Sequence, residues 1–395
     1  MQMDKNHSLE SDPKMTFIPS KPYNKLPLLP PKAEIETTAI LKKCIKSHTA
    51  LATLKMAGQL LPNEDVLINA IPLLEAKDSS EIENIVTTTD DLFRQSTLHE
   101  KNVPHHIKEA IRYRTALYEG YQALAEHPLS TSTAIKICQT IKGVEIDIRK
   151  TPGTTLMNDQ TGEVIYVPPI GQELIRDKLA NLELFMHGEE KIGAHEIDPL
   201  VRMSVMHYQF EAIHPFADGN GRTGRIMNIL FLLQEELLEL PILYLSRYIL
   251  NNKADYYKLL LEVTEKKAWE PWIKFMLDAV AETADWTTER IKTIRRLMND
   301  TEEYVKISAP SIYSPDLIDL IFAQPYCRIR NVIDTGIAKR QAASTYLKQL
   351  VKLGILTEEK HGREKIFRHP KFIEILKDEN NTFVPYNITQ PLKSE

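Results

Sequence analysis

The stretch His214-Pro-Phe-Ala-Asp218-Gly-Asn-Gly-Arg222-Thr-Gly-Arg225 is the part of the chain that decides its fold and chemistry. Two apolar helical runs, residues 200–213 and 226–240, enclose it, so the pattern predicts a loop that opens a helix. Glycines inside the loop let the backbone approach a ligand closely, and free amides at a helix N-terminus favour an anion. The stretch therefore predicts an anion-binding site.

The side chains of this loop suit polyphosphate chemistry. Asp218, its only carboxylate, can hold a divalent cation against phosphates, because Mg²⁺ usually takes one or two carboxylates plus phosphate oxygens. The imidazole of His214 titrates near neutral pH and can take a proton from an attacking hydroxyl. Arg222 and Arg225 are three residues apart, hence on one helix face, where two guanidinium groups can grip a polyphosphate. Together these residues predict phosphoryl or nucleotidyl transfer.

The loop resembles the signature of the Fic family, His-Pro-Phe-x-(Asp/Glu)-Gly-Asn-Gly-Arg-x-x-Arg, and matches it at every fixed position. The resemblance implies transfer of AMP from ATP to a Ser, Thr or Tyr hydroxyl of target proteins and of the chain itself. It implies that His214 is the catalytic base, that Asp218 binds Mg²⁺ and that Arg222 and Arg225 contact the outer phosphates. The amides of 219–221 and Asn220 would surround the α-phosphate. The implied ATP-binding residues of the loop are Gly219, Asn220, Gly221, Arg222, Thr223, Gly224 and Arg225.

An acidic, hydroxyl-rich helical segment at 78–84 would by itself be a capped, solvated helix face. Many Fic proteins carry an inhibitory helix with the motif (Ser/Thr)-x-x-x-Glu-(Gly/Asn), which Ser79, Glu83 and Asn84 match. The resemblance implies that Glu83 enters the ATP site and pairs with Arg225. ATP would then bind with its α-phosphate misplaced, so the chain would inhibit itself.

Two further parts of the ATP and target sites follow from the resemblance. Residues 149–155 and 163–169 flank a turn at 158–162 and predict a β-hairpin, which is either purely structural or the family's target-docking flap. The flap residues would be Val164, Ile165, Tyr166 and Val167. Tyr257, and second to it Tyr256, would contact adenine, although paired tyrosines are usually core residues. His207 is expected to be a packed core histidine.

The C-terminal part has its own pattern after a long helix at 279–305. Helices are predicted at 314–323, 329–334 and 338–353, followed by two strands within 355–367 around His361 and Gly362, an order that resembles a winged helix. Residues 326–369 contain ten Lys and Arg against four Asp and Glu. The basic third helix, which has no asparagine to read bases, leaves DNA binding and protein contacts open. Its cations are Lys339, Arg340, Lys348 and Lys352.

The predicted fold class is mainly α, a Fic-type helical bundle with a small β-hairpin flap, followed by a small α+β winged-helix domain. An extended, proline-rich N-terminal strap would pack its apolar residues on the body, or less plausibly serve as a recognition ligand. The predicted parts are the strap at 1–32, a helical region at 33–102 with the inhibitory helix at 79–84, a catalytic core at 103–285, a connecting helix at 286–313, the winged helix at 314–370 and a tail at 371–395.

Composition sets broad bounds. The chain has 395 residues, 43% of them hydrophobic, and a net charge of −5, which selects no partner. Three widely spaced cysteines suggest neither disulfides nor a zinc site, and a reducing cytoplasm fits them. The apolar runs are too short to span a bilayer, and the N-terminus lacks the apolar core of a signal peptide. Oligomeric state stays open, a homodimer included.

Two other functions remain as alternatives to AMP transfer. Some Fic relatives with an altered loop bind ATP reversed and act as kinases, but those relatives replace the first glycine and the first arginine, whereas Gly219 and Arg222 are present here. A transcription regulator whose Fic core only senses ATP would act through the winged helix. An intact base at His214 argues against that alternative, because a sensor has no use for it.

Overall fold

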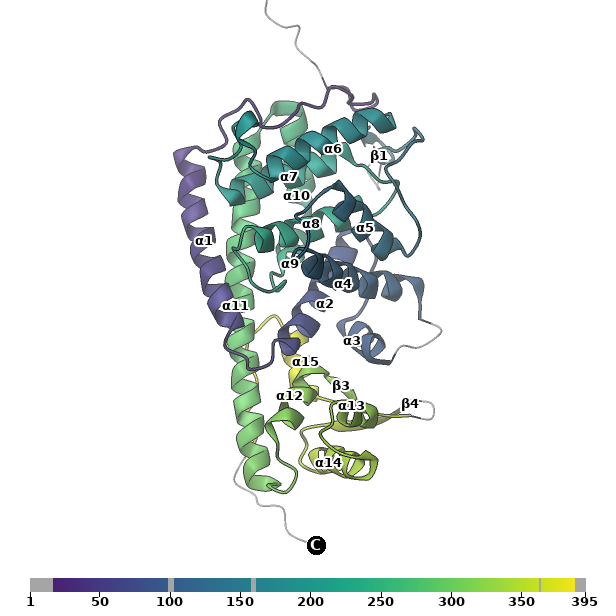
Figure 1. The fold of residues 1–395 in the computed structure, drawn as a ribbon, viewed down its shortest axis with the longest axis vertical. Coiled ribbons are helices and arrows are strands. Elements are labelled where there is room, and N and C mark those ends of the chain that lie inside the picture. Colours follow the sequence, from purple (N-terminus) through teal and green to yellow (C-terminus); the bar gives the residue numbers. More distant parts are fainter. Residues whose placement is uncertain (1–16, 99–102, 158–160, 362–363, 388–395) are drawn as a thin grey trace, which may run out of the picture.

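Helices form most of the structure, a computed structural model that describes residues 17–98, 103–157, 161–361 and 364–387. The molecule is elongated, with a large helical part at one end and a small helix-and-strand unit at the other (Figure 1). The predicted mainly α fold class is confirmed. The helices of the larger part are α1 (Thr38–Gly58), α2 (Asp65–Ile82), α3 (Thr89–Leu98), α4 (His105–Ala123), α5 (Thr131–Lys142), α6 (Gln172–Met186), α7 (Pro199–Ile213), α8 (Asn220–Gln234), α9 (Leu245–Asn251), α10 (Lys253–Lys266) and α11 (Trp269–Ser308).

Helices α7 and α8, on either side of the 214–225 loop, lie at the centre of the core. Asp198 caps α7 by accepting a hydrogen bond of 2.8 Å from the Leu200 amide, and Pro199 occupies the first helical position. Apolar side chains are buried on all sides of both helices, because α4, α5, α6 and α11 pack around them. The core therefore holds both ends of the loop in place.

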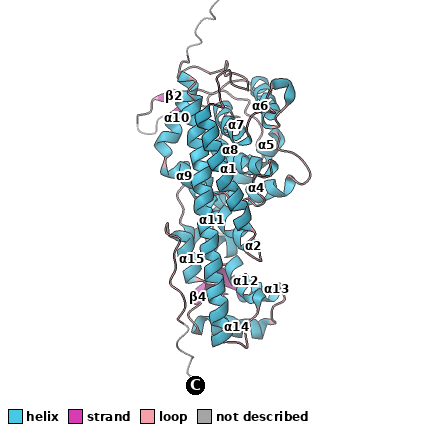
Figure 2. Ribbon diagram, turned by 90° about the vertical axis from the view of Figure 1, so that its left-hand side faces the viewer, coloured by secondary structure: helices cyan, strands magenta, loops and turns pink. Residues whose placement is uncertain are grey.

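The longest helix, α11, connects the large part with the C-terminal unit. Helix α1 packs along it in both views (Figures 1 and 2), and Ser47 donates to the Leu277 carbonyl at 2.8 Å. The long helix predicted at 279–305 begins earlier than expected: α10 ends at Lys266, Lys267 has a left-handed backbone, and Trp269 begins α11. The boundary predicted at 285/286 consequently lies inside one continuous helix.

The described part of the N-terminal strap packs on the body in part. Leu26 and Leu29 are buried, and the Lys178 ammonium donates to the Leu26 carbonyl at 2.6 Å. Two other apolar residues of the strap, Ile18 and Leu28, are exposed instead. Residues 1–16 of the predicted strap lie outside the described residues.

The predicted hairpin forms with shorter strands. Strands β1 (Leu156–Met157) and β2 (Val164–Tyr166) pair antiparallel, and residues 158–160 of the turn lie outside the described residues. The expected first strand at 149–155 is wrong, because that segment approaches the 214–225 loop instead. There the Arg149 amide donates to the Pro215 carbonyl at 3.0 Å.

The C-terminal unit has the order of elements expected for a winged helix. Its elements are α12 (Pro315–Ala323), β3 (Tyr326–Arg328), α13 (Ile329–Asp334), α14 (Arg340–Lys352), β4 (Thr357–His361) and β5 (Glu364–Arg368). The strands form one antiparallel sheet in the order β3-β5-β4, and β3 was not expected from the sequence. Residue 362 of the predicted turn lies outside the described residues.

The segment after residue 370 is more ordered than the predicted tail. Helix α15 (Pro370–Lys377) follows the sheet, and residues 378–387 continue along α11. There Thr293 donates to the Asn381 carbonyl at 3.1 Å, and the rings of Tyr304 and Tyr386 stack with centroids 5.1 Å apart. The predicted tail at 371–395 thus includes most of a helix, and residues 388–395 lie outside the described residues. None of the helices in the described ranges combines the length and apolar composition of a membrane span.

Candidate active site

The 214–225 loop begins where α7 ends. His214 is the C-cap, with a left-handed backbone (φ 51°), and its amide donates to the Phe210 carbonyl at 2.9 Å. The Arg149 guanidinium holds this end of the loop, donating to the His214 carbonyl at 2.7 Å and to the carbonyl of Pro169. Arg149 was not predicted to belong to the site, and an arginine inside an expected strand carried no signal for it.

A side chain inside the loop closes it. Asn220 is 2% exposed, accepts from the Phe216 amide at 2.8 Å and donates to the Phe216 carbonyl at 2.9 Å. Its amide group therefore shapes the loop, and the phosphate contact expected of this side chain stays a prediction. Gly219, with φ 86°, occupies a backbone conformation that other residues rarely adopt.

The N-terminus of α8 carries the site. Gly219 supplies no capping side chain, so the first amides of α8 make no side-chain cap bond within the described residues. Gly221 is needed for a second reason, because a Cβ atom there would lie 2.2 Å from Glu83 Oε1. The two glycines thus leave the helix end open, and the carboxylate of Glu83 lies against it.

The imidazole of His214 is suited to act as a base. Burial, and next the positive charge of Arg149, lower the pKa of His214 to about 4. The ring is therefore neutral at neutral pH and ready to accept a proton.

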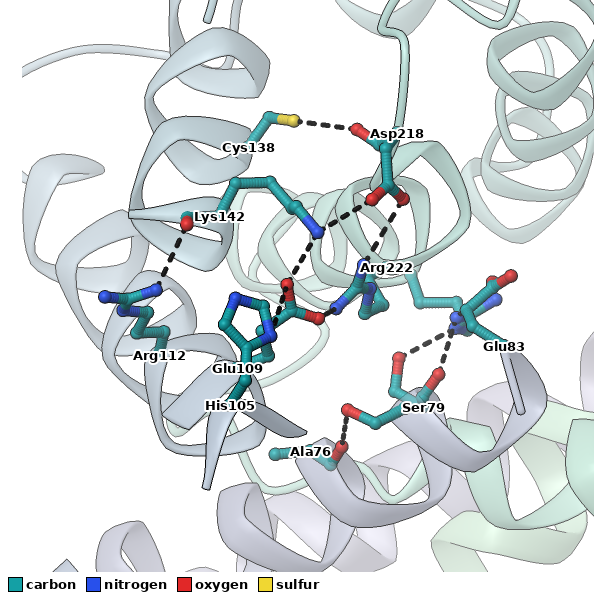
Figure 3. A network of polar contacts seen from close by, with 12 residues as sticks. Ala76, Ser79, Glu83, His105, Glu109, Arg112, Cys138, Lys142, Asp218 and Arg222 are labelled. Atoms are coloured by element: carbon teal, nitrogen blue, oxygen red, sulfur yellow. Dashed lines mark hydrogen bonds and ion pairs between the residues drawn. The ribbon is translucent and has the colours of Figure 1, made fainter. Parts of the chain in front are cut away.

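Asp218 belongs to a ring of alternating charges (Figure 3). The Lys142 ammonium lies 2.7 Å from Asp218 Oδ2 and 2.6 Å from Glu109 Oε1. Arg222 completes the ring, with Nη1 2.6 Å from Glu109 Oε2 and Nη2 3.5 Å from Asp218 Oδ1. Glu109 and Lys142 come from α4 and α5, and neither was predicted to belong to the site.

The ring shifts the protonation equilibria of its members. Burial would raise the pKa of Asp218, but the hydrogen bond and charge of Lys142 lower it below its ordinary value. Burial would likewise lower the pKa of Lys142, but its bonds to Asp218 and Glu109 raise it. Asp218 and Lys142 are therefore both charged at neutral pH, and Arg222, which is 1% exposed, is bonded to acceptors rather than open to solvent.

Arg225, one turn further along α8, points to the end of α2. Its Nε donates to Ser79 Oγ and its Nη2 to the Ser79 carbonyl, both at 2.8 Å. Nη2 also lies 2.8 Å from Glu83 Oε1, so the pair expected between Glu83 and Arg225 is present. Helix α2 ends at Ile82, before the expected helical segment does. Glu83 caps it, and Asn84 has a left-handed backbone and accepts from Lys253 Nζ at 2.9 Å.

Two buried carboxylates anchor α2 behind Ser79 and Glu83. Glu75 is fully buried and accepts from the Ser246 amide at 2.8 Å and from the Tyr113 hydroxyl at 3.0 Å. Asp78 accepts from the Tyr244 hydroxyl at 2.5 Å. Burial raises the pKa of Glu75 to about 7, more than its hydrogen bonds lower it. Helix α2 is thus tied to α4 and to the α8–α9 connection through groups that are costly to leave unpaired.

The tyrosines proposed for the adenine site occupy different environments. Tyr256 is 1% exposed, and its hydroxyl lies 2.8 Å from His207 Nε2. The ring of His207 stacks on Trp272 with centroids 6.0 Å apart, which confirms His207 as a core residue. Tyr257 is 44% exposed and packs edge-on against Tyr256. Of the two, only Tyr257 has a ring surface that a ligand can reach in this structure.

The predicted flap residues also include both exposed and buried side chains. Val164 and Ile165 are partly exposed, but Tyr166 and Val167 are buried, so half of the predicted docking residues face inward. The Tyr166 hydroxyl donates to the Ala212 carbonyl at 2.8 Å, which ties the flap to the end of α7. The strap covers the backbone at Val167, where the Tyr23 amide donates to its carbonyl at 2.9 Å.

The fold and the loop define a helical protein built around a helix N-terminus that carries a histidine, a carboxylate and two arginines. Three family models match the chain in succession. "Fic/DOC family N-terminal" matches residues 41–122, "Fic/DOC family" matches 128–232, and "Protein adenylyltransferase SoFic-like, C-terminal domain" matches 297–372. The chain thus carries a Fic/DOC domain, with the N-terminal region of that family before it.

Known proteins resemble parts of the chain at low identity. Protein adenylyltransferase fic-1 of Caenorhabditis briggsae is 26% identical over 110 residues, 27% of this chain and 19% of that protein. Protein adenylyltransferase Fic of Drosophila willistoni is 25% identical over 157 residues, 38% of this chain and 29% of that protein. The chain thus matches less than a third of the length of either relative. The crystal structure of a Fic family protein from Desulfovibrio desulfuricans G20 has the same fold, with a TM-score of 0.54 at 18% identity, covering 87% of this chain and 99% of that chain.

Proposed function

We propose that the chain is a protein adenylyltransferase, which transfers AMP from ATP to a Ser, Thr or Tyr hydroxyl of target proteins and of itself. The observation that carries the proposal is the joint placement of His214, Asp218 and the open N-terminus of α8 in one short loop. The names of the two relatives, both protein adenylyltransferases, support the same activity.

In the proposed reaction the target hydroxyl oxygen attacks the α-phosphorus of ATP. The bond from that phosphorus to the oxygen bridging to the β-phosphate breaks, and diphosphate leaves with the electron pair. The imidazole of His214, neutral at pH 7, takes the hydroxyl proton. The free amides at the start of α8, from Gly219 to Gly221, surround the phosphates, because a helix N-terminus favours negative charge. Arg222 and Arg225 contact the outer phosphates.

The residues of the loop fit the Mg²⁺ that the family implies. Asp218 is 63% exposed beside the open end of α8, and a single carboxylate suits an ion that takes its other ligands from phosphates and water. When bound, Mg²⁺ supplies positive charge that stabilises the leaving diphosphate. Asp218 would hold it, and Arg222, with Nη2 3.5 Å from Asp218 Oδ1, would keep the carboxylate in position.

The pair of Glu83 with Arg225 supports inhibition in cis as part of this proposal. Arg225 has its donors on Ser79 and Glu83, so the guanidinium is withheld from the γ-phosphate. The carboxylate also lies against Gly221, where it repels an incoming polyphosphate. Catalysis would fail even where ATP still binds, because the α-phosphate would be misplaced for in-line attack.

The remaining assignments complete the proposal. Tyr257, rather than the buried Tyr256, would contact adenine, and Val164 and Ile165 would meet the target segment. The partner of the basic helix α14, DNA or protein, stays open, as do a homodimer and the expected cytoplasmic location.

Labelled ATP tests the proposal against its two alternatives. Incubated with Mg²⁺ and cell lysate, a variant with Glu83→Gly should transfer label from the α-phosphate of ATP to protein, and none from the γ-phosphate. Transfer of γ-label would favour the kinase alternative. Absence of transfer from both positions, with ATP bound, would favour an ATP sensor that acts through the C-terminal unit.

A further inference from the structure

Lys142, the last residue of α5, contacts the carboxylate that the proposed function assigns to Mg²⁺, although it lies outside the loop. Its Nζ atom is 2.7 Å from Asp218 Oδ2 and 2.6 Å from Glu109 Oε1 (Figure 3). The side chain of Lys142 is 18% exposed and that of Glu109 is 2% exposed. Charges in such a partly buried site are screened less than surface charges. The ammonium therefore belongs to the electrostatics of the site.

Two carboxylates contact the ammonium of Lys142, and separate contacts fix its backbone. Glu109 binds it with one oxygen and uses the other for Arg222, so this buried carboxylate cannot turn away without leaving a cation unpaired. Behind Lys142 the backbone turns at Gly143 (φ 67°), and Arg112 Nη1 donates to the Lys142 carbonyl at 3.1 Å. Lys142 thus reaches Asp218 from a fixed base, unlike a flexible surface lysine.

We propose that Lys142 is a resident cation of the metal site: in the nucleotide-free protein its ammonium neutralises Asp218 and opposes the binding of a free divalent ion. This inference rests on the proposed function, which places the metal at Asp218. A divalent ion on Asp218 shares a carboxylate with Nζ, so two like charges come within a few ångströms. The phosphates of ATP bring negative charge that offsets this repulsion. The site accordingly selects the metal–nucleotide complex over the metal alone.

Two other roles for Lys142 give different expectations. A lysine that only stabilises the fold would change the midpoint of unfolding without changing metal affinity. A lysine that only orients Asp218 would be needed for metal binding, so its loss would weaken the affinity. The resident cation alone predicts that removing the charge strengthens binding of the free ion.

Binding of Mn²⁺ to the nucleotide-free protein, followed by the electron paramagnetic resonance of the free ion, tests the proposal. We expect Lys142→Met to bind Mn²⁺ at least about tenfold more tightly than the wild type, because one repelling charge is gone. Lys142→Gln, which keeps a hydrogen-bonding group for Glu109, should do the same if the methionine variant fails to fold. Lys142→Arg should stay close to the wild type. Lys136→Met, an exposed lysine of the same helix, controls for net charge.

The same titration with a non-hydrolysable ATP analogue present should show a smaller effect of Lys142→Met, because the phosphates offset the ammonium. Equal or weaker Mn²⁺ binding by Lys142→Met, with Asp218→Asn still abolishing binding, would overturn the resident cation and leave the proposed metal ligand intact. Unchanged Mn²⁺ binding by Asp218→Asn would instead overturn the metal assignment of the proposed function. The two failures are therefore distinguishable.

Discussion

Replacing Glu83 is the perturbation for which the structure allows the clearest magnitude. Its carboxylate accepts one charge-assisted hydrogen bond, 2.8 Å from Arg225 Nη2. Such a bond contributes about 1.5–3 kcal/mol, and because the side chain of Glu83 is 32% exposed we use the lower end. About 1.5 kcal/mol corresponds to roughly tenfold in an equilibrium. Repulsion of the phosphates by a carboxylate lying against Gly221 adds to this, so tenfold is a minimum.

The assay measures the initial rate of self-labelling with ATP labelled at the α-phosphate, at saturating ATP and Mg²⁺. Glu83→Gly should label at least about tenfold faster than the wild type. Glu83→Gln should fall between them, because the side chain stays while its charge is lost. Glu81→Gln, whose carboxylate pairs with Lys77 on the same helix, is the matched control and should label as the wild type does. Arg225→Ala should not raise the rate, because it also removes a phosphate contact. An unchanged rate for folded Glu83→Gly would refute inhibition in cis.

Three further outcomes are expected. His214→Ala should lower the rate of AMP transfer by a factor of about 10² to 10⁴ while ATP binding persists. In the wild type, stopped assays across pH should show that the rate falls through protonation of His214 only as the pH approaches about 4. The pKa of Glu75 is raised from 4.5 to about 7, so its contribution to the free energy of unfolding is full below pH 4.5 and is lost as pH rises through 7. Denaturant titrations should show that the free energy of unfolding falls by about 3 kcal/mol over this range. The variant Glu75→Gln should abolish this fall. If α14 binds DNA phosphates, reversing the charges of Lys339 and Arg340 should flatten the dependence of affinity on salt by roughly 0.9 per lost contact; a gel shift indifferent to both would indicate a protein partner.

The parts of the site that could be predicted are those encoded in neighbouring residues. The glycines, His214 and Asp218 follow one another, and the pair of Glu83 with Arg225 was expected because each lies in a short motif of its own. Glu109 and Lys142 lie in separate helices with no motif around them, and a lone acid or lysine on a helix is usually a solvated side chain. Only the tertiary packing of α4 and α5 against α8 brings them to Asp218.

The fold was predictable to a similar extent. The bounds of α13 agree with the predicted 329–334, since apolar periodicity and flanking turn residues mark that helix. Helix α15 was missed although His369-Pro370 is a usable start signal, with Pro370 at the first position and apolar residues at 372, 373, 375 and 376. The predicted start of the long helix at 279 is wrong, because α11 begins at Trp269 and continues through that position; Pro271 lies in its first turn, where a proline is compatible with a helix.

The C-terminal unit and the end of α2 are mechanical neighbours. Helix α12 of the C-terminal unit packs on α2, and Lys377 of α15 binds Asp90 of α3 at 2.7 Å. Helix α2, which presents Glu83, therefore lies between α8 and the C-terminal unit. Any displacement of α2 that frees Arg225 must be accommodated at α12. A macromolecule that binds the C-terminal unit and shifts α12 would change the free energy of moving α2. By reciprocity, moving α2 would change the binding free energy of that macromolecule by the same amount. In the proposed function, ATP at the 214–225 loop and a partner of the C-terminal unit would thus act on one equilibrium, the position of α2.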